Sequence, residues 1–275
     1  MTLFVTAVDE PIYLVPFIRR VVQTCGATVV GVAEVAPRQS RVNVRRSASL
    51  ALLGLLLFSP RQLLRLGWFR LLEAGAALGL TKTTHRLGDM CRELSIPFRR
   101  IESANHPVFI GHLAELGVDV LLNQTSELLR EPLLITPRLG VINRHLSLLP
   151  AYRGAWPIFW QFAMREREVG VTIHLVDRGL DSGEILAQSA MPRSPRATMA
   201  ATVAALFDRS APLMCEALRR LEAGEPRLPN DGATATTFRT PAPIDVIRYA
   251  VGLEVRARPA RPGQQVNPDG RQGNH

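Results

Sequence analysis

Three polar side chains stand in or just after stretches that are otherwise apolar. Asn143 and His145 lie in the run Val141 to Leu148, and Asp181 lies in the segment DRGLDSGE. Buried strands are usually apolar throughout, so a polar side chain within one needs a hydrogen-bond partner or a chemical role. A carboxamide, an imidazole and a carboxylate could together serve acyl transfer, because amide and imidazolium can hydrogen-bond an oxyanion while the carboxylate orients the imidazole.

The same pattern allows other interpretations. A lone Asn-x-His in a strand is most often a satisfied polar pair without further function. Ser147 shares a face with His145, but the sequence has no G-x-S-x-G turn, which disfavours a covalent serine mechanism. His174 alternates with apolar neighbours, which predicts that it supports the sheet. His145, His174, Asp177 and Asp181 lack metal-ligand spacing, and we therefore expect no metal site.

Strand-like and helical patterns alternate along the chain. Apolar, β-branched runs that predict strands are 2–8, 27–35, 118–124, 139–147 and 169–177. Helical patterns cover 9–26, capped by Asp9 and stopped by Gly26, and also 85–97, 106–117, 198–208 and 210–225. This alternation is typical of an α/β fold with a doubly wound, mostly parallel sheet, whose ligands bind beyond the carboxyl ends of the strands. Asn123, Asn143, His145 and Asp177 fall at such ends.

The segment 37–84 is too long for an ordinary strand-to-helix connection. Ser59 and Gln62 form a capping-box pattern around Pro60, and the helix after them mixes leucines, Trp68 and arginines. We expect a helical insertion that acts as a lid or faces a partner. Peripheral contact with a membrane surface is the alternative for such a basic, amphipathic helix. A homodimer is left open.

Composition excludes several classes of protein. The longest apolar run, 50–58, is too short to span a bilayer, and the N-terminus predicts a strand and not a signal peptide. The isolated Cys25, Cys91 and Cys215 predict neither a disulfide framework nor a zinc site, which favours a reducing, cytoplasmic setting. The formal net charge of +9 would suit nucleic acid, but charge alone indicates only non-specific affinity, so we expect no nucleic-acid partner.

Two long motifs, NRHLSLLPAYRG and GVTIHLVDRGLDSGEILAQ, stand in the order and spacing found in one family. Together they resemble the paired signature of the folate-dependent formyltransferases, the superfamily of the glycinamide ribonucleotide, methionyl-tRNA and sugar N-formyltransferases. The resemblance implies a catalytic domain over 1–225 with a Rossmann-like fold, followed by a C-terminal extension over 226–255. The residues 256–275 are rich in Pro, Gly, Gln and Arg without apolar periodicity, which predicts a disordered tail.

The resemblance also implies roles for individual residues. The family's catalytic Asn, His and Asp match Asn143, His145 and Asp181, and the formyl donor would be 10-formyltetrahydrofolate. The expected folate contacts are Ser126, Leu129, Val176, Asp177 and Gly179. This sequence departs from the family at Asn123 and Gln124, where small or apolar residues are common, and that departure bears on how folate is held.

The acceptor is expected to be a small-molecule amine. No glycine-rich phosphate loop follows the first strand, and residues after Glu225 are too few and too proline-rich for the barrel domain of the tRNA enzymes. The segment YRGAWPIFW is similar to one in sugar N-formyltransferases, which implies a nucleotide-linked amino sugar in contact with Tyr152, Arg153 and Trp156. The alternative is that Arg153 and Gly154 only shape the turn. The alternatives are a 10-formyltetrahydrofolate hydrolase and a catalytically silent scaffold that docks through 37–84.

Overall fold

The computed structural model describes residues 1–36, 53–54, 56, 60–64, 67–68, 71 and 86–255. Most of the predicted insertion and the whole predicted tail, 256–275, lie outside the described residues. In the part of the insertion that is described, Leu64, Trp68 and Leu71 are exposed, and the side-chain amide of Gln62 donates to the hydroxyl of Tyr13 at 2.8 Å. No helix among the described residues is long and apolar enough to cross a bilayer.

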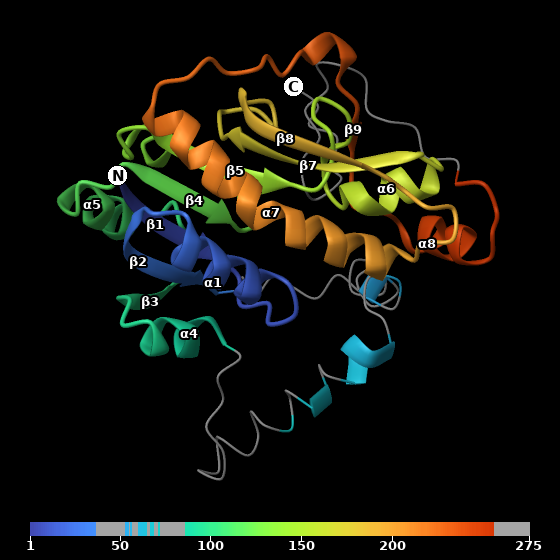
Figure 1. The fold of residues 1–275 in the computed structure, drawn as a ribbon, viewed down its shortest axis with the longest axis horizontal. Helices are drawn as coiled ribbons and strands as arrows, with labels where there is room; N and C mark the ends of the chain where they lie inside the picture. Colours follow the sequence, from blue (N-terminus) through green and yellow to red (C-terminus); the bar gives the residue numbers. More distant parts are fainter. Residues whose placement is uncertain are drawn as a thin grey trace. The chain divides into compact units, whose positions relative to one another are not determined.

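Seven strands form one sheet, in the order β3-β2-β1-β4-β5-β7-β8 (Figure 1). Their bounds are Thr2–Ala7 (β1), Thr28–Val35 (β2), Phe98–Ile101 (β3), Val120–Gln124 (β4), Gly140–His145 (β5), Glu168–Leu175 (β7) and Ile185–Pro192 (β8). The pairs β2–β3, β1–β2, β1–β4 and β4–β5 are parallel, and β7–β8 is antiparallel. The predicted α/β class with a mostly parallel sheet is confirmed.

The described chain divides into two compact units. The first lies within 1–36, 60–144 and 210–226, and the second within 53–56, 145–209 and 227–255. Residues 1–225, which the sequence assigns to one catalytic domain, are divided between the two units. Most of the extension 226–255 belongs to the second unit.

The first unit has an apolar centre. Its helices are α1 (Leu14–Thr24), α4 (Leu87–Glu93) and α5 (Pro107–Glu115), with a short 3-10 turn, η1, at Leu133–Ile135. Leu3, Phe4 and Leu121 are almost completely buried, and the rings of Phe4 and Phe109 meet edge to face at 5.5 Å. The parallel strands β2, β1 and β4 therefore present a buried surface to these helices, and their carboxyl ends share one edge.

The second unit combines the β7–β8 hairpin with a small parallel pair, β6 (Arg153–Gly154) and β9 (Thr237–Phe238). Its helices are α6 (Pro157–Ala163), α8 (Pro243–Ala250) and the short turn η2 (Gly232–Thr234). Trp160 stacks on Phe238 at 4.9 Å and donates its indole N–H to the carbonyl of Arg239. The C-terminal extension is thereby held against α6.

One helix prediction is wrong, and two strands were not predicted. The patterns 198–208 and 210–225 form one helix, α7 (Met199–Glu222), with Pro212 inside it. The helix continues because a buried apolar stripe runs past the proline, through Leu206, Met214 and Leu218. Strands β3 and β8 were not expected, because β3 has two exposed arginines at its centre and β8 is buried only over its first three residues.

The start of α1 also differs from the prediction. The carboxylate of Glu10 accepts hydrogen bonds from the backbone N–H groups of Ile12, Tyr13 and Leu14 at 2.7–2.9 Å, so Glu10 satisfies the orphan donors. Asp9 instead accepts from the N–H of Leu87, at the start of α4. The predicted stop is confirmed, since the helix ends at Thr24, Cys25 is its C-cap, and Gly26 has a φ of +70°.

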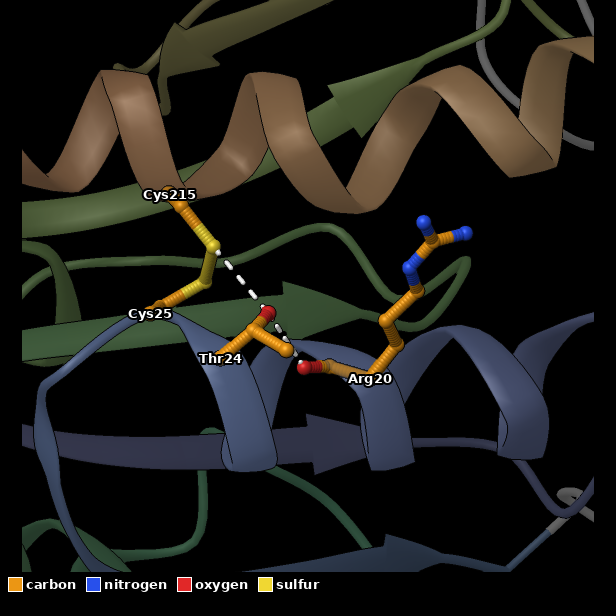
Figure 2. The surroundings of a disulfide bond; sticks show 4 residues. All are labelled: Arg20, Thr24, Cys25 and Cys215. Carbon is orange, nitrogen blue, oxygen red and sulfur yellow. Dashed lines mark hydrogen bonds between the residues drawn. A yellow bond between two sulfur atoms is a disulfide. The ribbon is translucent and has the colours of Figure 1, made fainter.

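A disulfide joins Cys25 to Cys215, across 190 residues of sequence and with 4.5 Å between the Cα atoms (Figure 2). Beside it, the Thr24 hydroxyl donates to the carbonyl of Arg20 and lies 3.5 Å from Sγ of Cys215. The expectation of unpaired cysteines is therefore wrong, because spacing along the chain does not reveal which distant cysteines meet. The argument for a reducing setting loses this premise. Cys91 stays free and buried, and burial raises the pKa of its thiol to about 11.

Candidate active site

His145 ends strand β5, and its ring faces the carboxylate of Asp181. Nδ1 of His145 lies 3.6 Å from Oδ2 of Asp181, and both side chains are mostly buried. Nε2 of the same ring lies 2.8 Å from the carbonyl oxygen of Tyr152. A carbonyl can only accept, so Nε2 carries the hydrogen, and a second proton on Nδ1 would create an imidazolium directed at Asp181.

Asp181 is held in place by its backbone as well as by its side chain. Its φ is +48°, in the left-handed region that Asp and Asn adopt more readily than most residues. Oδ2 accepts from the N–H of Gly154 at 2.8 Å. The side-chain amide of Asn230 donates to the carbonyls of Asp181 and Gly183, both at 2.9 Å. Asn230 belongs to the C-terminal extension, and no local sequence signal pointed to it.

His174, which the sequence assigns to sheet support, also faces this carboxylate. Its Nδ1 donates to the carbonyl of Leu175, so the neutral ring has a bare Nε2. That Nε2 is buried, lies 3.7 Å from Oδ1 of Asp181 and has no hydrogen-bond partner within the described part of the chain. Burial lowers the pKa of His174, against the opposing effect of the Asp181 carboxylate. Two imidazoles thus flank one carboxylate.

The three predicted acceptor contacts lie in the loop after β5 and at the start of α6. The Tyr152 hydroxyl donates to Glu166, and its ring stacks on Phe238 at 5.2 Å. The guanidinium of Arg153 donates to the backbone and side-chain oxygens of Asn230 at 3.1 and 2.7 Å. Trp156 is half-buried, with a φ of +59°. Internal contacts thus engage Tyr152 and Arg153, and an acceptor role for these residues stays a prediction.

Asn143 lies in β5 within the first unit, directly opposite Asn123 in β4. Side chains two residues apart in a strand share a face, so Asn143 and His145 lie on the same face of β5. Oδ1 of Asn143 accepts from the side-chain amide of Gln124 at 3.0 Å. Asn123 accepts from the hydroxyls of Thr6 and Thr125. Both residues that depart from the family pattern are therefore buried members of a polar network at the end of β4.

The predicted folate contacts lie in two places. In the first unit, Ser126 is exposed and Leu129 is buried, in the segment that follows β4. In the second unit, Val176 is half-buried, and Asp177 and Gly179 are exposed. Oδ1 of Asp177 accepts from the N–H of Gly179 and from the hydroxyl of Ser182, which fixes the turn that leads to Asp181.

A serine nucleophile and a metal centre find no support in this geometry. The fully buried Ser147 hydroxyl donates to the carbonyl of Ala151, and its own carbonyl accepts from Thr172. Among the described residues, no group of three or more His, Cys, Asp or Glu side chains is arranged to hold a metal ion. What remains in the second unit is an imidazole–carboxylate pair, His145 and Asp181, which can hold and release a proton.

The fold is that of an α/β protein with a mostly parallel sheet and polar side chains at the ends of its strands. The model of the formyl transferase family matches residues 27–218 of this sequence, and the chain belongs to that family. The family match confirms the expected class of enzyme.

Curated relatives match between 47% and 60% of this chain. The methionyl-tRNA formyltransferase of Synechococcus sp. (strain JA-3-3Ab) is 42% identical over 132 residues, which are 47% of this chain and 41% of the relative. That of Deinococcus radiodurans is 36% identical over 160 residues, 58% of this chain and 50% of the relative. The chain spans about half the length of the curated relatives it matches.

Solved structures share the fold at low identity. Phosphoribosylglycinamide formyltransferase from Bacillus halodurans matches with a TM-score of 0.56 and 18% identity, over 80% of this chain and 95% of that chain. A sugar N-formyltransferase from Shewanella sp. FDAARGOS_354 matches with a TM-score of 0.55 and 17% identity, over 86% of this chain and 76% of that chain. These likenesses bear out the predicted Rossmann-like formyltransferase fold.

Proposed function

We propose that this chain moves a formyl group from 10-formyltetrahydrofolate to a primary amine. The observation that carries the proposal is the approach of Nδ1 of His145 to Oδ2 of Asp181, at 3.6 Å, with Asn143 two residues earlier on the same face of β5. Family membership supports the same chemistry.

The residues present fit a formyl donor of this kind. Such a donor supplies a formyl carbon already activated on nitrogen, so the protein needs no covalent nucleophile, and Ser147 is engaged elsewhere. Oδ1 of Asn143 is occupied by Gln124, whereas Nδ2 has no hydrogen-bond partner among the described residues. A donor that lacks a partner at a strand end suits the oxygen that becomes negative when an amine adds to a carbonyl.

Each member of the trio then has a distinct task. The exchange forms one C–N bond, breaks another, and moves one proton from the acceptor amine to the leaving nitrogen. His145 can hold that proton on Nδ1, and Asp181 stabilises and orients the resulting imidazolium. Asn143 donates from Nδ2 to the oxyanion. The proposed folate contacts are Ser126, Leu129, Val176, Asp177 and Gly179.

We propose an amino sugar, nucleotide-linked, as the acceptor. The half-buried Trp156 supports this choice, because an aromatic side chain that is not fully buried can stack on a sugar or a base. Methionyl-tRNA is the second candidate, and the names of the relatives at 36–42% identity favour it. Formyl release to water remains a third outcome of the test.

The test is turnover of 10-formyltetrahydrofolate by the purified chain, alone, with a panel of nucleotide-linked amino sugars, or with methionyl-tRNA. Tetrahydrofolate production is followed by absorbance and the formyl adduct by mass spectrometry. The proposal expects turnover that depends on one amino sugar and an adduct of that sugar. Formylated methionyl-tRNA would replace the proposed acceptor, and formate without any amine would indicate a hydrolase. No turnover under any condition would contradict the proposed transfer to these acceptors.

A further inference from the structure

We propose that Gln124 is a positioning residue that fixes the side-chain amide of Asn143 in the one orientation that presents its N–H donor. This inference rests on the proposed function, in which Asn143 donates to an oxyanion. Gln124 is the last residue of β4 and is 7% exposed, so its amide cannot turn toward solvent.

The orientation of the Gln124 amide follows from its two other partners. Nε of Arg144 lies 2.9 Å from Oε1 of Gln124, and a guanidinium can only donate. Nε2 of Gln124 lies 2.6 Å from the carbonyl oxygen of Asn123, which can only accept. Exchanging oxygen and nitrogen of this amide would oppose donor to donor at one end and acceptor to acceptor at the other.

The remaining hydrogen on Nε2 then decides the orientation of Asn143. Nε2 of Gln124 lies 3.0 Å from Oδ1 of Asn143, and because Nε2 is a donor, the Asn143 atom that faces it must be the oxygen. The opposite end of the Asn143 amide is therefore Nδ2. In the reversed orientation Asn143 would present an oxygen to a developing anion, which is repulsive.

Arg144 anchors this chain of donors from behind. Its guanidinium carbon lies 4.9 Å from the centre of the Phe17 ring, a cation–π distance. Burial lowers the pKa of Arg144 to about 9, against the effect of the Glu10 carboxylate, so the group remains a charged donor at neutral pH. Arg144 therefore donates to Gln124, and Gln124 donates to Asn143. This leaves the Nδ2 donor of Asn143 available.

Gln124→Glu is the decisive substitution. A carboxylate keeps the bond from Arg144 but has no hydrogen to donate, so Asn143 is expected to turn and direct Nδ2 at Glu. Turnover should fall about 10²- to 10³-fold, the loss typical of one missing oxyanion donor, with little change in KM for the amine. The thermal unfolding midpoint should fall only modestly, because the ion pair with Arg144 offsets the lost hydrogen bond to the carbonyl of Asn123. Turnover within about threefold of wild type would overturn the inference.

A matched control and a double variant separate positioning from general damage. Gln23→Glu makes the same chemical change on the exposed face of α1 and should leave turnover at the wild-type level. In an Asn143→Ala background, Gln124→Glu should reduce turnover by less than about twofold, because the group that Gln124 positions is already gone. A full additional loss in that background would indicate a structural role alone.

An NMR measurement tests the inference without relying on catalysis. In ¹⁵N-labelled wild-type protein, the Asn143 side-chain amide should exchange quickly with solvent, since Nδ2 makes no hydrogen bond in the described structure. In Gln124→Glu the same signal should shift downfield and exchange more slowly, because Nδ2 now donates to the carboxylate. Inactive wild type with this NMR change would refute the proposed function and retain the positioning role. An unchanged signal would refute the positioning role.

Discussion

Nδ1 of His145 and Oδ2 of Asp181 lie 3.6 Å apart, close enough for attraction and longer than a hydrogen bond. Each partner is fixed separately: the histidine by the carbonyl of Tyr152, and the carboxylate by the N–H of Gly154. The pair is therefore pre-positioned without being locked, and a proton on Nδ1 would shorten the contact.

Asp181→Asn should abolish most formyl transfer while leaving the fold intact. The amide matches the carboxylate in size and its oxygen can still accept from Gly154, but it cannot stabilise an imidazolium. We expect turnover to fall about 10²- to 10⁴-fold in Asp181→Asn and by a similar factor in His145→Ala. The circular dichroism spectrum of each variant should match that of wild type. Wild-type turnover in either variant would contradict the proposed catalytic role of that residue.

His174 predicts a specific dependence of stability on pH. Its pKa in the folded protein is below the ordinary value of 6.5, so the unfolded chain binds a proton that the folded chain resists. The stability due to the neutral, buried ring is full above pH 6.5 and is lost as the pH falls from 6.5 toward the lower folded pKa. Wild type should therefore unfold at lower temperature at pH 5.5 than at pH 7.5.

The matching variant is His174→Phe, which keeps an aromatic ring but cannot titrate. Its unfolding midpoint should change less between pH 7.5 and pH 5.5 than that of wild type, even if the midpoint itself is lower at both. An equal or larger pH effect in His174→Phe would show that another group is responsible.

The sequence predicts the candidate site from polar residues at the ends of apolar strands. Asn143 and His145 are conspicuous because polar side chains are rare in buried strands, and the paired motif brings Asp181 to them. The part that His174 plays in the site could not be predicted from the sequence, because this residue follows the alternation of an ordinary sheet residue. Only the turn of the chain over residues 176–183 brings the Asp181 carboxylate to Nε2 of His174.

Long-range partners explain the remaining misses. Asn230 lies 49 residues after Asp181, in a segment whose composition predicts only a loop, and its hydrogen bonds depend on the pairing of β9 with β6. From the sequence, Gln124 is only a departure from the family pattern. Its role could not be predicted, because the orientation of its side-chain amide depends on hydrogen-bond donors and acceptors that no local sequence pattern specifies.

Asn230→Asp should slow catalysis by loosening Asp181. The new carboxylate would face the carbonyls of Asp181 and Gly183, to which the amide donates, while still accepting from Arg153. We expect kcat to fall about tenfold or more with a smaller change in KM, together with faster hydrogen exchange in residues 176–183. The control is Arg227→Gln, which removes an exposed ion pair to Glu184 in the same segment and should alter neither quantity. Equal effects of the two substitutions would contradict a specific role for Asn230.

The Cys25–Cys215 disulfide should contribute measurably to stability, because it closes a very long loop in the unfolded chain. The sequence separation of 190 residues places its contribution at the upper part of the usual range, about 2–5 kcal/mol. Cys25→Ser/Cys215→Ser should unfold at lower denaturant concentration than oxidised wild type and should no longer respond to dithiothreitol, and Cys91→Ala should still respond. Alkylation in denaturant without reductant should label only Cys91, and labelling of all 3 cysteines would show that the bond does not form.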